Sequence, residues 1–164
     1  MNRLNTSIDV DDQIQTSLNT YSDMIVRIAY QNLKSMADAE DIAQEVFLKR
    51  MTASPAFENE THEKAWIIRV TVNLCKDFLK SSWFKKTTAL DENIPSPDEN
   101  NEVLDAVMHL PVKFRNVIYL HYYEDMTVAQ IAGILQKKEN TVSSWLHRAR
   151  KLLKESLTGG FDDE

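Results

Sequence analysis

Apolar residues recur at intervals of three and four along most of the chain, the spacing that places them on one side of an α-helix. The pattern is weak over residues 1–10 and strong afterwards. The β-branched run at residues 70–72 lies inside a helical pattern, so it does not indicate a strand. We therefore predict an all-α protein. The helices are expected over about residues 11–33, 38–51, 62–86, 102–110, 111–122, 127–135 and 139–157.

The last quarter of the chain predicts two short helices joined by a turn. Thr127 followed by Gln130 is a capping-box pattern, in which the hydroxyl accepts a backbone N–H and the amide side chain reaches back. Polar residues 136–138 interrupt the pattern, and a second helix begins at about Glu139. One side of that helix is apolar and carries Val142, Trp145, Leu146, Ala149, Leu152 and Leu153. The other side carries Ser143, Ser144, His147, Arg148, Arg150, Lys151 and Lys154.

The polar side of this second helix has the composition of a DNA-binding surface. It carries four fixed positive charges, small hydroxyls and one histidine, and no acidic residue lies between Ser143 and Glu155. Cations bind phosphates, and short polar side chains reach base edges in the major groove. The two helices therefore fit a helix-turn-helix whose second helix is the recognition helix. Amphipathic helix pairs also occur in proteins that bind no DNA, where a basic side is only solvated, and this alternative stays open.

The predicted helix over residues 38–51 suggests a surface for a protein partner. Asp38 is expected to cap its N-terminus, and Ile42 and Val46 to face the core. Its polar side carries Asp41, Gln44 and Glu45. This side is either ordinary solvated surface or a docking site for an arginine-rich partner.

The third helical pattern mixes bases, aromatics and an amide, a combination that suits unpaired DNA. Its inward side is expected to carry Trp66, Ile67, Val70, Leu74 and Phe78. Its other sides carry Lys64, Arg69, Asn73, Lys76 and Lys80. Phe57 lies among polar residues in the preceding loop. An aromatic there is more often a plug into its own core than a platform on which a base stacks, and both hypotheses remain.

Charge is unevenly distributed along the chain, whose formal net charge is −6. Residues 111–157 hold eight Lys/Arg and four Asp/Glu, whereas residues 91–110 hold six acids and no base. The stretch LDENIPSPDENN contains two prolines and little to bury, so it predicts a flexible acidic linker. We therefore divide the chain into a helical domain at 1–88, a linker at 89–101, a helix-turn-helix domain at 102–157 and an acidic tail at 158–164.

Several classes of function are not supported by the sequence. The single cysteine excludes an internal disulfide framework, and Cys75 is expected to be a buried structural thiol. The four histidines are scattered, and neither a zinc-protease motif nor a glycine-rich phosphate loop is present. We expect no metal, no cofactor and no enzymatic activity. No stretch has the length of a membrane span and no secretory signal is visible, so we expect a cytoplasmic protein without membrane insertion.

In three stretches the sequence resembles the extracytoplasmic-function (ECF) sigma factors, which are sigma-70 family group IV. These are DAEDIAQEVF at 38–47, AWIIRVTVNLCKDFL at 65–79, and 110–153 with its LP opening and its T-V-x-S-x-L-x-R-A-R ending. The resemblance covers about residues 21–157. It implies a factor that directs core RNA polymerase to specific promoters and helps melt the −10 element, in response to an envelope or environmental stress.

The resemblance also implies roles for individual residues. The first domain would bind the clamp helices of the polymerase β′ subunit through Asp41, Gln44 and Glu45. It would hold the melted −10 element with Phe57 and Asn73, while Lys64, Arg69, Lys76 and Lys80 follow the phosphates. The second domain would rest on the β flap and bind the −35 element through Ser143, Ser144, His147, Arg148 and Lys151. An anti-sigma factor is a further partner that the family suggests.

The sequence departs from the family pattern at the turn of the helix-turn-helix. Gln136 stands where the family commonly has glycine, and Lys137 stands where it has an aliphatic residue. A residue with a side chain in a left-handed turn costs about 1 kcal/mol, so a different turn is possible here. The competing hypothesis for the whole chain is a free-standing helix-turn-helix regulator that binds palindromic DNA as a dimer.

Overall fold

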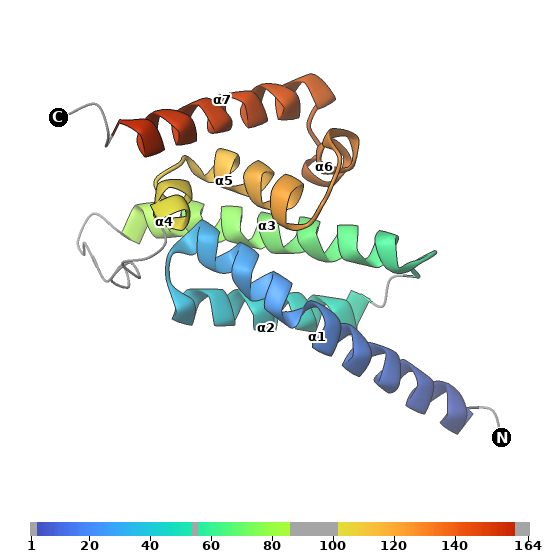
Figure 1. The fold of residues 1–164 in the computed structure, drawn as a ribbon. Coiled ribbons are helices and arrows are strands. Elements are labelled where there is room, and N and C mark those ends of the chain that lie inside the picture. The colour runs from blue at the N-terminus through green and yellow to red at the C-terminus, as the bar shows by residue number, and fades with distance from the viewer. Residues whose placement is uncertain (1–2, 54–55, 86–101, 160–164) are drawn as a thin grey trace. The chain divides into compact units, whose positions relative to one another are not determined.

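The computed structural model describes residues 3–53, 56–85 and 102–159, and all regular structure within these ranges is helical. The chain divides into two compact units, residues 1–84 and 85–164, which we describe separately (Figure 1). The predicted linker at 89–101, together with residues 54–55 and 160–164, lies outside the described residues.

Unit 1 consists of three helices: α1 (Arg3–Leu33), α2 (Met36–Ala53) and α3 (Glu60–Lys85). Helices α1 and α2 form an antiparallel pair joined by a tight turn at Lys34, which adopts a left-handed conformation with φ 56°. The N-terminal turns of α1 extend beyond the ends of α2 and α3 (Figure 1). The fully buried large side chains are Ile25, Ile28, Val46, Ile67, Ile68, Thr71 and Val72.

Two helix starts in unit 1 differ from the prediction. Helix α1 begins at Arg3, although residues 1–10 have only a weak apolar pattern. Helix α2 begins at Met36, and the hydroxyl of Ser35, not the carboxylate of Asp38, accepts a backbone N–H at its start. Ser35 is as good a capping residue as Asp38, and it stands directly after the left-handed turn at Lys34, so the turn decided between them.

The side of α3 that was predicted to face the core was wrong, because the buried side is rotated from it by part of a helical turn. Ile67, Ile68, Thr71, Val72 and Cys75 are buried, and Thr71 donates to the Ile67 carbonyl. The residues expected to face inward that are only half-buried are Trp66, Val70, Leu74 and Phe78. The buried stripe contains a threonine and a cysteine, whereas the half-buried side carries larger apolar groups, and this misled the assignment from sequence. Aromatic and aliphatic surface is therefore partly available beside Asn73.

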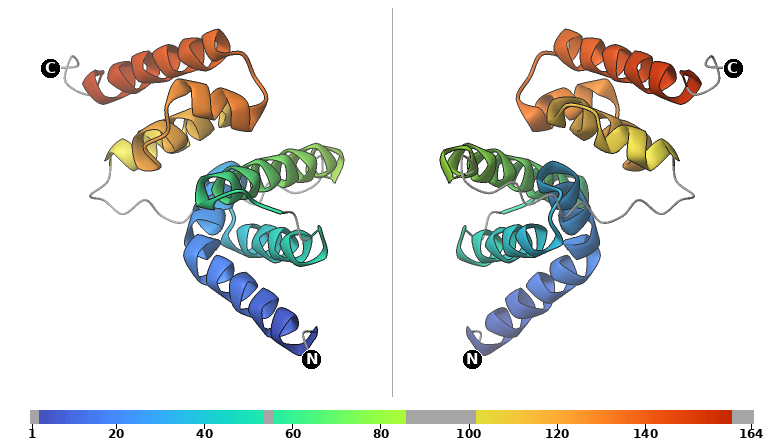
Figure 2. Two further views of the ribbon diagram at one scale, coloured as in Figure 1. Left: turned by 90° about the vertical axis from the view of Figure 1, so that its right-hand side faces the viewer. Right: turned by 90° about the vertical axis from the view of Figure 1, so that its left-hand side faces the viewer.

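Unit 2 consists of α4 (Glu102–Met108), α5 (Val112–Ile118), one turn of π-helix η1 (Tyr119–Tyr123), α6 (Val128–Leu135) and α7 (Glu139–Thr158). Helix α7 lies along α5, and α6 lies at the end where the chain turns into α7 (Figure 2). The core consists of Ala106, Leu110, Phe114, Val117, Ile118, Leu120, Ile131, Ala132, Ile134, Val142, Leu146 and Ala149.

The helix-turn-helix forms as predicted. The capping box is complete, because the Gln130 N–H donates to the Thr127 hydroxyl at 3.2 Å and the Thr127 N–H donates to the Gln130 side chain at 2.9 Å. Gln136 ends α6 in the left-handed conformation, with φ 56° and ψ 47°. The chain therefore keeps the left-handed turn and bears its cost without a glycine.

Arg115 stabilises the turn between α4 and α5. It is 4 % exposed, and its guanidinium donates to the carbonyls of Met108 and Leu110 at 2.9 and 3.1 Å. Burial lowers the pKa of this guanidinium. Pro111 stands at the N-cap of α5 and not at the first helical position that we predicted. Its carbonyl accepts the N–H groups of both Phe114 and Arg115.

Three apolar residues of unit 2 are exposed, and one of them, Leu152, was predicted to lie on the buried side of its helix. Val103 and Leu104 of α4 are 56 % and 55 % exposed, and Leu152 of α7 is 40 % exposed. Helix α4 is only two turns long, and it buries a narrow strip centred on Ala106. A strip of that width leaves the larger side chains of Val103 and Leu104 exposed to solvent.

Candidate nucleic-acid interface

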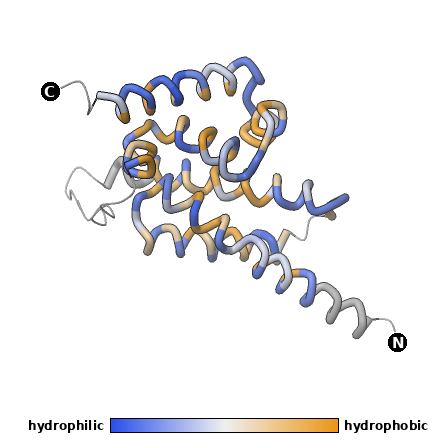
Figure 3. The backbone as a smooth tube through the Cα atoms, viewed as in Figure 1, coloured by the Kyte–Doolittle hydropathy of each residue, from blue (hydrophilic) through white to orange (hydrophobic). Residues whose placement is uncertain are grey.

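The outer side of α7 presents the residues predicted to bind DNA. The exposed residues are Ser143, Ser144, His147, Arg148 and Lys151. Directly beneath them, Val142, Leu146 and Ala149 are at most 1 % exposed. Hydrophilic residues occupy most of α7, in contrast to the hydrophobic α6 (Figure 3). The helix is thus divided lengthwise into an anchoring side and a polar side.

The positively charged side chains on α7 differ in their contacts within the protein. Arg150 donates from Nε to the hydroxyl of Tyr122 on η1, and its guanidinium lies 5.5 Å from the centre of that ring. Within the described ranges, Arg148 and Lys151 have no ion-pair partner. Lysine and arginine side chains that carry no internal counter-charge are available for phosphates, whereas Arg150 is already engaged with Tyr122.

Helix α2 presents the predicted partner surface on the side away from its core. Asp41, Gln44 and Glu45 are all exposed. The opposite side buries Ala39, Ile42, Ala43 and Val46. Leu48 and Met51 extend the exposed side toward the C-terminus and are 55 % and 42 % exposed. The sequence analysis did not single out these two residues, although Leu48 follows Asp41 by seven positions, two helical turns.

The basic and amide residues of α3 lie along one length of helix. Asn73, Lys76 and Lys80 are exposed, whereas Lys64 and Arg69 are half-buried and already have interactions within the protein. Trp66 and Asn73 are seven residues apart and share a side, with about 10 Å between them along the axis. The structure therefore places an indole, an amide and two lysines along α3.

Phe57 lies against the start of α3. Its ring centre is 5.7 Å from that of Trp66 and 5.5 Å from that of His62, both in edge-to-face geometry. The guanidinium of Arg50 lies 4.8 Å from the centre of the ring. The side chain is half-buried, so it is neither a plug sealed in the core nor a freely exposed platform. Two edge-to-face contacts and one cation over the ring restrict the orientation of the side chain.

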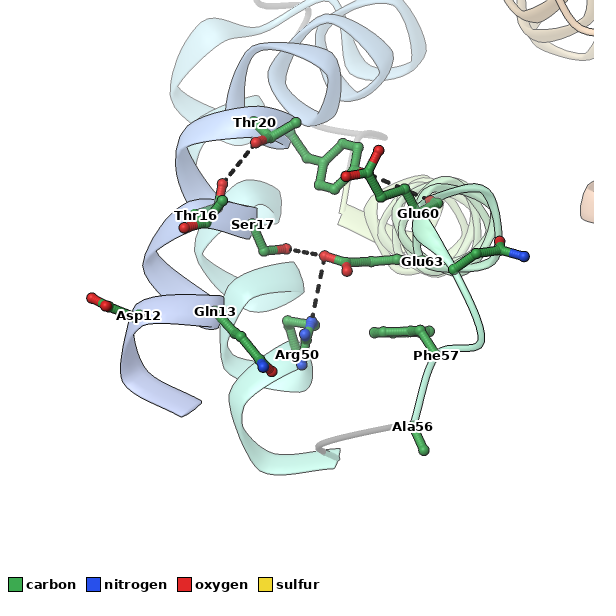
Figure 4. A pocket seen from close by; sticks show the side chains of 12 residues that line it. Asp12, Gln13, Thr16, Ser17, Thr20, Arg50, Ala56, Phe57, Glu60 and Glu63 are labelled. Atoms are coloured by element: carbon green, nitrogen blue, oxygen red, sulfur yellow. Dashed lines mark hydrogen bonds and ion pairs between the residues drawn. The ribbon is translucent and has the colours of Figure 1, made fainter. Parts of the chain in front are cut away.

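A pocket of about 610 Å³ adjoins Phe57 and Arg50 (Figure 4). It is lined by residues of α1, α2, α3 and the preceding loop: Asp12, Gln13, Thr16, Ser17, Thr20, Tyr21, Arg50, Ala56, Phe57, Asn59, Glu60 and Glu63. The Tyr21 hydroxyl donates to the Glu60 carbonyl at 3.5 Å. Burial raises the pKa of Tyr21, and the nearby carboxylates of Glu63 and Glu60 raise it further, so the phenol stays neutral.

A buried polar network lies at one wall of this pocket. Nε of Arg50 is 3.9 Å from a carboxylate oxygen of Glu63, an ion pair too long to be a hydrogen bond. The Ser17 hydroxyl donates to the same carboxylate oxygen. This network was not predicted from the sequence, yet a signal was present: Arg50 follows Ile42 and Val46 at intervals of four, and Glu63 precedes Ile67 by four. A base and an acid at apolar positions of two helices predict a buried pair.

Other chemistry is not supported by the described residues. Burial raises the pKa of the Cys75 thiol to about 12, so this cysteine is not a nucleophile at neutral pH. No group of three or more His, Cys, Asp or Glu within the described ranges could hold a metal ion. None of the described helices is both long and apolar enough to span a membrane.

The comparisons with known proteins agree with these features. Residues 18–85 match Sigma-70 region 2 and residues 100–153 match Sigma-70 region 4. The chain is 28 % identical to the RNA polymerase sigma factor SigV of Bacillus subtilis, over 87 % of this chain and 90 % of that protein. It is 25 % identical to the ECF RNA polymerase sigma factor SigW of the same organism, over 89 % of each. The fold is similar to that of the sigma factor RpoE of Bartonella quintana, solved with the anti-sigma factor NepR, at a TM-score of 0.73 and 19 % identity, over 93 % of this chain and 99 % of that one.

The helix-turn-helix and the exposed basic side of α7 are typical of a helical DNA-binding protein. With both regions matched in order over most of its length, the chain belongs to the ECF branch of the sigma-70 family of RNA polymerase sigma factors. Such factors bind core RNA polymerase and promoter DNA, and this chain acts in promoter-specific initiation of transcription.

Proposed function

We propose that the two units bind two separate promoter segments while core polymerase holds the two units at a fixed spacing. Residues 1–88 would bind polymerase and the −10 element, residues 102–157 the −35 element, and residues 89–101 would connect them. The observation that carries this proposal is the division of α7 into buried Val142, Leu146 and Ala149 and an exposed basic side. The polymerase supplies the chemistry, and this chain supplies recognition and strand opening.

Contact with the −35 element is assigned to five residues on the exposed side of α7. These are Ser143, Ser144, His147, Arg148 and Lys151. Arg148 has the fork geometry that matches a guanine edge, and Lys151 is a point charge for a phosphate. Arg150 lies on the flank of the helix against Tyr122, and we assign it no base contact.

Docking on polymerase is assigned to the exposed side of α2. Asp41, Gln44 and Glu45 offer acceptors for arginines on the β′ clamp helices. Leu48 and Met51 supply adjacent apolar surface that becomes buried on docking. Unit 2 would rest on the β flap.

Capture of the −10 element is assigned to α3 and the loop before it. Phe57 and Asn73 would hold unpaired bases, one by stacking and one by hydrogen bonds. Lys64, Arg69, Lys76 and Lys80 would follow the phosphates of the strand. Asn73→Ala is therefore expected to impair open-complex formation more than binding to core polymerase.

We propose that an anti-sigma factor binds this chain in the cytoplasm and releases it in response to an envelope or environmental stress. A similar fold was solved with an anti-sigma factor bound, which supports this proposal. A free-standing dimeric regulator is less well supported, because both region matches occur in one chain in the order of a sigma factor.

In vitro transcription tests the proposal. Core polymerase is incubated with sheared genomic DNA, with and without this chain, and the 5′ ends of the transcripts are mapped. RNA starting at defined sites only with the chain supports the proposal, and those sites give the promoter sequence. Transcripts whose start sites do not depend on the chain would overturn it. Tight, sequence-specific binding by the chain without polymerase would favour the free-standing regulator.

A further inference from the structure

The network of Ser17, Arg50 and Glu63 joins all three helices of unit 1, and its Arg50 contacts the ring of Phe57. Ser17 comes from α1, Arg50 from the last turn of α2 and Glu63 from the first turn of α3. Arg50 and Ser17 are 9 % and 6 % exposed. Buried charges are costly unless a partner compensates them, and here Glu63 is the compensating charge.

The guanidinium of Arg50 has two neighbours of different chemistry. Nε faces the carboxylate of Glu63, and the planar group lies over the ring of Phe57 at 4.8 Å. A cation placed on an aromatic face is attracted by the ring quadrupole, and this attraction strengthens where water is excluded. Apart from the ion pair, Nε of Arg50 has no hydrogen-bond partner in the described structure. Glu63 and Phe57 are thus the two neighbours that the described structure gives for this guanidinium.

Phe57 depends on this contact for its orientation. It precedes the first turn of α3, in a stretch without regular secondary structure. Trp66 and His62 lie in edge-to-face geometry with its ring, and the guanidinium of Arg50 lies over the ring. The cation favours one tilt of the ring, because its attraction to the ring quadrupole depends on lying over the face. Stacking on an unpaired base requires one face in a fixed orientation.

Ser17 lies outside the segment that matches region 2, which begins at residue 18. Its hydroxyl nevertheless donates to the carboxylate oxygen of Glu63 that pairs with Arg50. The N-terminal part of α1 thus contributes to the site through Glu63. Figure 4 shows Ser17, Glu63 and Arg50 converging beside Phe57.

We propose that Arg50, held by Glu63 and Ser17, is a positioning residue that fixes Phe57 in the orientation needed to receive an unpaired base of the −10 element. This inference rests on the proposed function. Arg50 itself touches no DNA. Its effect reaches the strand only through the ring of Phe57.

The test measures strand capture separately from folding and from polymerase binding. Holoenzymes are prepared with the wild-type chain, Arg50→Lys, Phe57→Leu and the double variant. Each is titrated with a single-stranded oligonucleotide that carries the non-template −10 segment of a promoter mapped as above. Assembly with core polymerase and urea unfolding of each chain are measured in parallel. Arg27→Lys, at an exposed arginine of α1, is the matched control.

Lysine keeps the charge that pairs with Glu63 but lacks the planar group that stacks on the ring. We expect Arg50→Lys to bind the oligonucleotide about tenfold more weakly, the scale of one lost base–aromatic stack, with polymerase assembly unchanged. In the Phe57→Leu background, Arg50→Lys should add little further loss, because the ring through which it acts is gone. The control should bind as the wild type does.

Two results would overturn the inference. One is wild-type affinity for the strand in Arg50→Lys, and the other is a loss that is fully additive with Phe57→Leu. If the variant proves too unstable to assemble, Arg50→Met with Glu63→Leu replaces the ion pair by apolar groups. Wild-type strand binding in that double variant also counts against the inference. Failure of the wild-type chain to start RNA at any site refutes the proposed function instead.

Discussion

The two units build the surfaces that we propose to face DNA in different ways. In unit 2, one helix carries the whole surface, and α7 only has to be anchored through Val142, Leu146 and Ala149. In unit 1, the surface is assembled from the loop that carries Phe57 and from α3, and it is held by polar side chains from three helices.

This difference determines which mutations should matter. A surface on one helix tolerates changes around it as long as the helix stays anchored. A surface assembled around buried charges depends on groups that never touch the ligand, because a buried charge that loses its partner is costly. The predictions below test this contrast in order of decreasing effect.

Leu146→Ala should have the largest effect. Leu146 is 1 % exposed beneath the polar side of α7, and loss of its buried methyl groups should destabilise unit 2 by about 3 kcal/mol. Arg148→Ala, on the opposite side, should change stability by less than about 0.5 kcal/mol yet weaken promoters that depend on a −35 element. Urea unfolding and footprinting of holoenzyme measure the two effects. Equal losses of stability would contradict the division of α7.

Glu63→Gln should destabilise unit 1 by about 2 kcal/mol, because it leaves the buried guanidinium of Arg50 without a counter-charge. Glu60→Gln is the control, since Glu60 occupies the same first turn of α3 but is exposed. Both changes remove one helix N-terminal charge, worth about 0.5 kcal/mol. The difference between the urea-unfolding midpoints of the two variants measures the contribution of the buried ion pair to stability. Identical midpoints would mean that this ion pair does not stabilise unit 1.

The stability of unit 1 should fall at alkaline pH because of Cys75. Burial raises the pKa of this thiol to about 12 in the folded chain, whereas the unfolded thiol ionises near pH 8.5. The unfolded state therefore gains a charge that the folded state cannot adopt as the pH rises above 8.5. Relative to Cys75→Ala, the wild type should lose about 2 kcal/mol between pH 7.5 and pH 10. Parallel pH profiles for the two proteins would exclude a buried thiol.

Gln136→Gly should change the free energy of unfolding least, and it should raise this free energy and not lower it. Gln136 has φ 56°, and glycine relieves the strain of this conformation at an entropic cost, leaving a gain of about 0.5 kcal/mol. Lys137→Gly is the control, because Lys137 does not have a positive φ and glycine can only add entropy there. Thermal unfolding measures the change in stability caused by each of the two substitutions. Stabilisation by both substitutions would mean that the left-handed turn is not strained.

Much of unit 2 could be predicted from sequence, because its signals are local. The capping box at Thr127 and Gln130 depends on residues three apart, and the division of α7 depends on helical spacing alone. The site residues on α7 and on α2 were predicted by the same spacing together with the family resemblance, and they are exposed. Exposure leaves them free to bind but does not test their roles, which remain predictions.

The errors occurred where a neighbouring element decides the outcome. The inward side of α3 was misassigned because Thr71 and Cys75 are buried despite larger apolar residues beside them. Likewise, the apolar residues Val103 and Leu104 are exposed, because α4 is too short to bury more than the strip around Ala106. Neither fact is encoded in the spacing within one helix.

The sequence by itself determined the helical class, the capping box of the helix-turn-helix and the polar side of α7, because each depends on contacts within a few residues. Only the tertiary structure decided that Ser17, Arg50 and Glu63 meet beside Phe57. These residues come from three helices, and a buried ion pair forms only where packing brings its members together and removes the water that would otherwise solvate them.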